Sequence, residues 1–249
     1  MKKVGILQPG YLPWLGFFDQ LYQCDIFVFL DDVQYTKHDW RNRNRIKIPE
    51  GILWLSIPVL TKGKLDQKIS DARIDKKRLW QKKHLKRFES FYKKAKYFDE
   101  IIDLMYDIYH KEYTFLIDVD MDFILKVHRY LSIKTEILFS SEIQITGIKD
   151  EKVLSICQYL NATHYLSGDA ARDYLREDIF SSEGIIVEWQ NYRHPYYDQL
   201  WKKEQGFISH LSIIDLLFNH GTDSLEILTG EKVIRQPDGI ICRNANDIK

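Results

Sequence analysis

The chain has 249 residues, which is enough for one large domain or two small ones with a sizeable core. Apolar residues make up 45% and charged residues 29% of the chain, a balance that excludes an intrinsically disordered protein. Lys plus Arg and Asp plus Glu each total 36, so the net charge is zero and provides no bulk attraction to nucleic acid or an anionic membrane. Any anion must therefore be bound by a local patch.

The N-terminal apolar run ends at Gln8 and Pro9, and no stretch of about 18 apolar residues follows, so we expect no membrane span and a cytoplasmic location. The three cysteines, Cys24, Cys157 and Cys242, are far apart and form no CxxC pair. This spacing disfavours a zinc knuckle and a disulfide framework. Cys24 and Cys157 lie in apolar surroundings, which are typical of buried, inert thiols.

Short β-type runs alternate with longer helical patterns along the chain. Strands are predicted for residues 4–8, 25–31, 54–59, 164–167 and 185–189. Helical periodicity is clearest for residues 77–131 and 150–160. These patterns predict an α/β fold, with a largely parallel or mixed sheet flanked by helices. We expect a single α/β domain over 1–221, with a helical subdomain or lid at 76–135, and a C-terminal helix and polar tail over 222–249.

Within the helical segment, residues 76–96 are rich in Lys and Arg interleaved with apolar residues. We interpret them as an amphipathic helix with a solvated basic face. In the tail, Thr222 is the predicted N-cap of a helix and Gly230 its stop.

The first loop with functional potential follows the first strand and leads into a helix. Two prolines and two glycines fix its path, and Tyr11 and Trp14 offer flat, half-polar surfaces. Ligands of open α/β sheets bind beyond the carboxyl ends of strands, and the polar Gln8 stands at such an end. The alternative is a rigid strand-to-helix turn with a packed Trp.

The second candidate begins with Asp31 and Asp32, after an apolar strand, followed by Gln34. A carboxylate there needs a partner, and we expect it in the segment that comes next. In that segment an extended chain would place alternate residues on opposite faces. One face would carry Arg41, Arg43, Arg45 and Lys47, and the other Asn42 and Asn44. The row predicts an anion site, for example for a nucleotide diphosphate, or else Asp–Arg ion pairs with surface charge.

A third motif ends a strand with Ser167, Gly168 and Asp169 and continues to Arg172. Ser167 or Asp169 is expected to cap a helix whose first-turn N–H groups hold an anion, and capping alone is the alternative.

A fourth motif follows the last predicted strand and includes His194, Tyr197 and Gln199. His194 is the best general-base candidate because imidazole titrates near neutral pH, although a structural role stays open. Further on, Ser212 is predicted to begin a helix that Gly221 ends. Asp215 lies amid apolar residues there, which indicates a buried partner or a site role.

Taken together and in this order, these blocks resemble the WbqC-like family. The matching text is QPGYLPWLGFFDQL, DIFVFLDDVQYTKHDWRNRNRIK, WLSIPV, THYLSGDAARDYL, HPYYDQLW and LSIIDLLFNHG. The resemblance implies a place in the synthesis of O-antigen, capsule or similar glycans, in pathways that add acyl or aminoacyl groups, glycyl among them, to amino sugars. A fainter likeness to adenylating and nucleotidyl-transferring α/β folds lacks their histidine signature after the first strand.

Our leading hypothesis is an enzyme that transfers an acyl or aminoacyl group to the amine of a nucleotide-linked amino sugar. Asp31, Asp32 and His194 are the catalytic candidates, with Asp31 or His194 taking the amine proton. Arg43 and Arg45 would hold the diphosphate. The full set of predicted substrate-binding residues is Gln8, Tyr11, Trp14, Gln34, Asn42, Arg43, Asn44, Arg45, Ser167, Gly168, Asp169, Arg172, Tyr197, Gln199 and Asp215.

The alternatives are an ATP-dependent amide-forming ligase or nucleotidyltransferase-like enzyme, and a binding module for glycans or nucleotide-linked sugars without catalysis. No duplex nucleic acid is expected as a partner, charged tRNA stays open as a donor, and no cofactor or metal is assigned.

Overall fold

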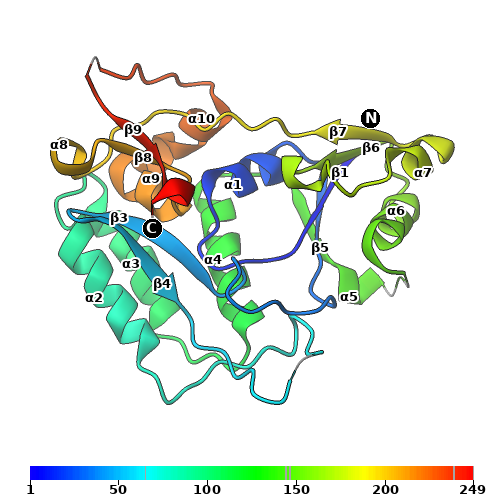
Figure 1. Cartoon of the computed structure of the whole chain (residues 1–249), viewed down its shortest axis with the longest axis horizontal. Coiled ribbons are helices and arrows are strands. Elements are labelled where there is room, and N and C mark those ends of the chain that lie inside the picture. The colour runs from blue at the N-terminus through cyan, green and yellow to red at the C-terminus, as the bar shows by residue number, and fades with distance from the viewer. Residues whose placement is uncertain (65, 144, 146, 238, 249) are drawn as a thin grey trace. The chain divides into compact units, whose positions relative to one another are not determined.

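The computed structural model describes residues 1–64, 66–143, 145, 147–237 and 239–248 (Figure 1). The chain folds into two compact units, each discontinuous in sequence. The first unit comprises Met1–Pro9, Gly16–Val33 and Ile133–Arg193, and the second comprises Gly10–Leu15, Gln34–Ser132 and His194–Lys249.

The first unit contains a five-stranded sheet with the order β5-β2-β1-β6-β7, in which all neighbouring strands run parallel. The strands are β1 (Lys3–Leu7), β2 (Ile26–Phe29), β5 (Glu136–Phe139), β6 (His164–Ser167) and β7 (Ile186–Trp189). The predicted α/β class is confirmed, and so are four of these strands. Only β5 has no counterpart among the predicted strands.

Helices of the first unit cover both faces of this sheet. They are α1 (Leu15–Tyr22), α5 (Ser140–Ile143), α6 (Lys149–Tyr159) and α7 (Glu177–Ser182). On one face, Val28 joins a buried core with Cys157 of α6 and Phe180 of α7. On the other face, the ring centroid of Phe17 in α1 lies 5.9 Å from that of Phe27. Burial on both faces explains why the strands are near-continuous apolar runs.

The strand order of the sheet reverses between β1 and β6. Gln8 directly follows β1, and Ser167 is the last residue of β6. In open parallel sheets this point of reversal, beyond the carboxyl ends of the strands, is the usual place for a ligand.

The second unit contains a β-hairpin formed by β3 (Arg43–Ile48) and β4 (Gly51–Ser56). The two strands pair antiparallel, from Arg43 with Ser56 to Ile48 with Gly51. The strand predicted for 54–59 is therefore misplaced at both ends and lies outside the parallel sheet. The pairing stops short of Pro58, which has no N–H to donate to a ladder.

Helices make up most of the rest of the second unit. They are α2 (Trp80–Tyr92), α3 (Phe98–Tyr109), α4 (Leu116–Tyr130), α8 (Lys202–Gln205), α9 (Ile213–His220) and α10 (Ser224–Thr229), with a short parallel pair of β8 (Phe207–Ser209) and β9 (Cys242–Asn244). Helices α2, α3 and α4 confirm that the middle segment of the chain is mostly helical. The ring of Phe218 in α9 stacks on Tyr92 of α2 at 4.6 Å and on Phe98 of α3 at 5.9 Å.

Both predicted ends of α9 are confirmed. The Ser212 hydroxyl accepts a hydrogen bond from the N–H of Ile214, and Gly221 follows the last helical residue with a φ of 56°. A Cβ on Gly221 would lie 2.3 Å from the ring of Tyr97, so only glycine fits there. The predicted N-cap Thr222 is wrong, because it lies inside a 3-10 turn (Gly221–Asp223) that precedes α10.

Candidate functional site

The second unit has a pocket of about 510 Å³ whose wall is strongly basic. Five Lys and Arg side chains line the described part of this wall, against one carboxylate from Asp75. The five are Lys37, Arg43, Arg78, Lys83 and Arg87. In a chain of zero net charge this is the kind of local patch that binds an anion. We call it the basic pocket.

Two elements carry three of these five cations. Arg43 opens β3, and its guanidinium lies over the ring of Trp54 in β4, 4.5 Å from the centroid. Lys83 and Arg87 are four residues apart on α2 and therefore share one face of the helix. Arg87 also donates to the carbonyl oxygen of Trp54 at 3.3 Å, which ties α2 to the hairpin.

His84 lies between these two cations on α2 and also lines the basic pocket. Its Nδ1 is 2.8 Å from the hydroxyl of Tyr11, which is hydrogen-bonded in turn to the hydroxyl of Tyr109. Burial, together with the charges of Arg87 and Lys83, lowers the pKa of His84 to about 3. The imidazole is therefore neutral at physiological pH and is held in place by the Tyr11 hydroxyl.

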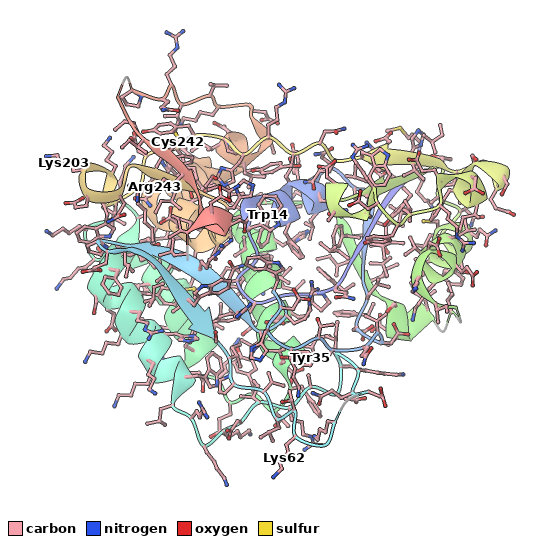
Figure 2. All side chains as sticks on the ribbon, in the orientation of Figure 1. Trp14, Tyr35, Lys62, Lys203, Cys242 and Arg243 are labelled. Atoms are coloured by element: carbon pink, nitrogen blue, oxygen red, sulfur yellow. The ribbon has the colours of Figure 1, made fainter. Side chains whose placement is uncertain are left out.

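The second unit also contains a buried carboxyl. Asp120 of α4 is fully buried, and neither of its oxygens has a hydrogen-bond partner among the described residues. Burial raises the pKa of Asp120 well above its usual value, and the nearby charge of Arg41 only partly opposes this effect. The side chain of Tyr35, labelled in Figure 2, lines the basic pocket. Burial raises the pKa of Tyr35 to about 12, and the nearby carboxyl of Asp120 adds to this effect.

The predicted row of cations divides between the pocket and the interior. Arg43 lines the basic pocket, whereas Arg45 is buried and donates to the backbone carbonyl of Ala245 and to the side chain of Asn246 at 2.6 Å. Lys47 is fully buried and donates to the Oε1 of Gln199 at 3.0 Å. Arg45 thus ties the hairpin to the C-terminal tail.

The two asparagines of this segment position backbone around the pocket. Asn42 lines the pocket and donates to the carbonyl oxygen of Ile57 at 2.7 Å. Asn44 is buried and donates to the carbonyl oxygens of Leu12 at 2.8 Å and Tyr11 at 3.3 Å. It therefore fixes the loop that carries Tyr11 toward His84.

Asp31 and Asp32 belong to the first unit, and their partners differ from the prediction. The Asp31 carboxylate accepts hydrogen bonds from the backbone N–H of Ser141 at 2.9 Å and from its hydroxyl at 2.6 Å. Asp32 forms an ion pair with Lys152 of α6. Burial opposes ionisation of Asp32, but the hydrogen bonds from Lys152 and Ser140 outweigh it and lower the pKa. The expectation that the partners lie in the next segment of the chain is therefore wrong.

The capped helix predicted after β6 is also wrong. Residues Asp169–Ala171 form a single 3-10 turn preceded by Gly168, without a side-chain cap. Arg172 folds back to donate to Asp169 at 3.1 Å and to Asn191 at 2.7 Å. Its guanidinium lies 4.5 Å from the ring centroid of Trp189. Such a short turn leaves no helix N-terminus to hold an anion.

His194 lies in an aromatic cluster of the second unit. Its ring is 5.0 Å from that of His210, which stacks in turn on Trp14 at 5.2 Å (Trp14 is labelled in Figure 2). Burial and the neighbouring His210 lower the pKa of His194 to about 4. A neutral imidazole at this position is compatible with either role that the sequence left open.

Asp215 has buried partners, which was one of the two alternatives that its apolar neighbours indicated. Its carboxylate accepts hydrogen bonds from the hydroxyls of Tyr92 at 2.7 Å and Tyr197 at 3.0 Å. Burial raises the pKa of Asp215 and lowers that of the adjacent Lys47 to about 8. Gln199 completes this network by accepting from the Lys47 ammonium.

A model of the WbqC-like protein family matches residues 8–227. The chain belongs to the WbqC-like protein family. It is also 40% identical over 230 residues to "Uncharacterized protein Rv1507c" of Mycobacterium tuberculosis, an alignment that covers 92% of this chain and 98% of the relative. No solved structure matches the chain.

The described part of this WbqC-like chain contains no group of three or more His, Cys, Asp or Glu side chains placed to hold a metal ion. Across the same residues, no helix is long and apolar enough to cross a membrane.

Sequence reasoning missed His84 and Asp120, although both carry a readable signal. His84 shares the helical face of Trp80 and Phe88, and Asp120 follows Leu116 by four residues on the inner face of α4. A polar residue on the apolar face of an amphipathic helix has to find a partner or serve a site.

Proposed function

We propose that this WbqC-like chain is an enzyme of O-antigen or capsule-type glycan synthesis. It transfers an acyl or aminoacyl group, with glycyl as one option, to the amine of a nucleotide-linked amino sugar. The observation that carries this proposal is the basic pocket. A nucleotide diphosphate needs several cations at one place, and the wall supplies five against one carboxylate.

The size and composition of the basic pocket fit such a ligand. Its volume of about 510 Å³ lies within the usual range for sites that bind small molecules. Arg43, Lys83 and Arg87 would bind the two phosphates.

In the transfer, the amine nitrogen attacks the acyl carbonyl carbon, the N–C bond forms, and the bond to the leaving group breaks. The amine loses one proton and the leaving group gains one. Of our proposed proton acceptors, His194 belongs to the same unit as the basic pocket, and His84 joins it because it lines that pocket, where the charge of a bound diphosphate would raise the pKa of its imidazole.

Isothermal titration with a UDP-linked amino sugar tests the binding step. Arg43→Gln and Lys83→Gln should each weaken binding at least tenfold, because a hydrogen bond to a charged group contributes about 1.5–3 kcal/mol. The matched control is Lys134→Gln, an exposed lysine of the first unit. If both pocket variants bind the UDP-linked amino sugar with the affinity of the wild type, the placement of the diphosphate is refuted.

Mass spectrometry of the amino sugar after incubation with activated acyl and aminoacyl donors tests the transfer. ATP with a free amino acid is the further arm, in which release of pyrophosphate would favour the activation alternative. Once turnover is found, a loss of less than tenfold in both His194→Ala and His84→Gln would refute these two proton acceptors.

A further inference from the structure

A second pocket lies between α2 and α3 in the same unit, with a volume of about 680 Å³. Its wall includes Lys76, Lys82 and Lys86 on one side and Tyr106, His110 and Glu112 on the other. None of these residues belongs to the basic pocket. We call this one the α2–α3 pocket.

Helix α2 presents a different pair of cations to each pocket. Lys82 and Lys86 line the α2–α3 pocket, whereas Lys83 and Arg87 line the basic pocket. Within each pair the residues are four positions apart, so each pair forms a stripe along the helix, and the two stripes lie about 100° apart around its axis.

The two pockets share part of their wall. Arg78 and Trp80 line both of them. Arg78 and Trp80 therefore form a wall common to both pockets, at the start of α2. An enzyme that joins two substrates needs two such neighbouring sites.

The lining of the α2–α3 pocket suits a nucleotide better than a simple anion. Lysines supply the charge for phosphates, and the stacked rings of Tyr106 and His110, 5.5 Å apart, supply a flat surface for a base. Glu112 would repel an isolated phosphate, but a carboxylate can accept hydrogen bonds from ribose hydroxyls or a base amine. Glu89, the other carboxylate of the wall, already accepts from the Tyr106 hydroxyl.

We propose that the α2–α3 pocket binds the acyl donor through a phosphate-bearing adenosine. This inference rests on the proposed transfer function and names its second substrate. Adenosine with phosphate is the part shared by acyl-coenzyme A, by the 3′ end of a charged tRNA and by an acyl adenylate. The acyl end of the donor reaches past Arg78 and Trp80 to the amine in the basic pocket. There the N–C bond forms, the donor's C–S or C–O bond breaks, and the released thiol, hydroxyl or phosphate takes the proton that the amine gives up.

The two stripes of α2 provide matched variants for the test. Isothermal titration uses the full chain with UDP, coenzyme A, deacylated tRNA and AMP as separate probes. The double variant Lys82→Gln/Lys86→Gln should lose at least tenfold in affinity for a donor probe and stay within twofold for UDP. The double variant Lys83→Gln/Arg87→Gln should show the reverse pattern. Both remove two exposed or half-exposed charges from one helix, and circular dichroism checks that both fold.

The pattern across the probes identifies the carrier. Selective binding of coenzyme A, of tRNA or of AMP supports the inference and names the thioester, the aminoacyl ester or the adenylate. If none of the three binds, or if both double variants weaken every probe alike, the inference is overturned.

Failure of the proposed function is a separate result. If UDP does not bind but a donor probe binds and depends on Lys82 and Lys86, the α2–α3 pocket stands and the diphosphate site falls. If UDP binding depends on Lys83 and Arg87 but binding of no donor probe depends on Lys82 and Lys86, the diphosphate site stands and the donor site in the α2–α3 pocket falls. A donor probe should still bind in the presence of saturating UDP, because the two ligands occupy different pockets.

Discussion

The contribution of the buried Asp120 carboxyl to the stability of the second unit should decrease as pH rises. Its pKa in the folded state is raised well above the unfolded value of 3.8 by burial. Between these two pKa values the folded carboxyl holds one proton more than the unfolded one, so the contribution of Asp120 to the free energy of unfolding falls by about 1.4 kcal/mol per pH unit. The substitution Asp120→Asn keeps the shape of the protonated side chain and removes this dependence.

The measurement is urea unfolding of the wild type and Asp120→Asn at pH 5, 6 and 7. The stability difference in favour of the variant should grow by up to about 2.7 kcal/mol across these two units. Tryptophan fluorescence reports on the relevant unit, because only Trp189 of the six tryptophans belongs to the first one. The exposed Asp103→Asn in α3 controls for the loss of one surface charge. Parallel stability curves for wild type and Asp120→Asn would refute the argument.

Two further predictions concern other buried groups. Burial raises the pKa of both Cys24 and Cys157 from 9.0 to about 12. A disulfide reagent should therefore modify only the exposed Cys242 (labelled in Figure 2) until denaturant is added. Rapid modification of two thiols in the native protein would contradict this. Tyr11→Phe removes a fully buried hydroxyl that has two hydrogen-bond partners, and should lower the stability of the second unit by about 1–3 kcal/mol in the same fluorescence assay, whereas an unchanged midpoint would show that neither bond contributes.

The parallel sheet could be predicted because its strands are buried on both faces. A run such as 26–29 is apolar throughout, so its pattern indicates a covered strand without any knowledge of its neighbours. β5 was missed because it is a short, partly exposed strand at the edge of the sheet, beside β2. Its four residues begin with Glu136 and carry little signal for a strand. β3 was considered only as an extended segment, because Arg, Asn and Lys are not typical of a buried strand.

The candidate site could be predicted only in part, because spacing shows which face of a strand a residue shares but not its long-range partners. The spacing of Arg43 and Arg45 places both on one face of a strand, and both guanidinium groups do lie over Trp54. Spacing alone could not show that Arg45 donates a hydrogen bond to the backbone carbonyl of Ala245, 200 residues away in the sequence. Long-range partners of this kind also decide the surroundings of Asp31, whose hydrogen bonds come from the start of α5.

The distribution of charge along the chain is more informative than its net charge. The segment 76–96 holds ten Lys and Arg residues against the single Glu89, within a chain whose total charge is zero. A solvated basic face explains why such a helix tolerates these residues, but it does not explain why α2 divides them between two pockets. Two phosphate-bearing substrates repel each other over a distance of about 8–10 Å at physiological salt. A wall that presents Arg78 to both pockets would reduce this repulsion where the reacting ends have to meet, which gives a shared cation a role that neither pocket would require alone.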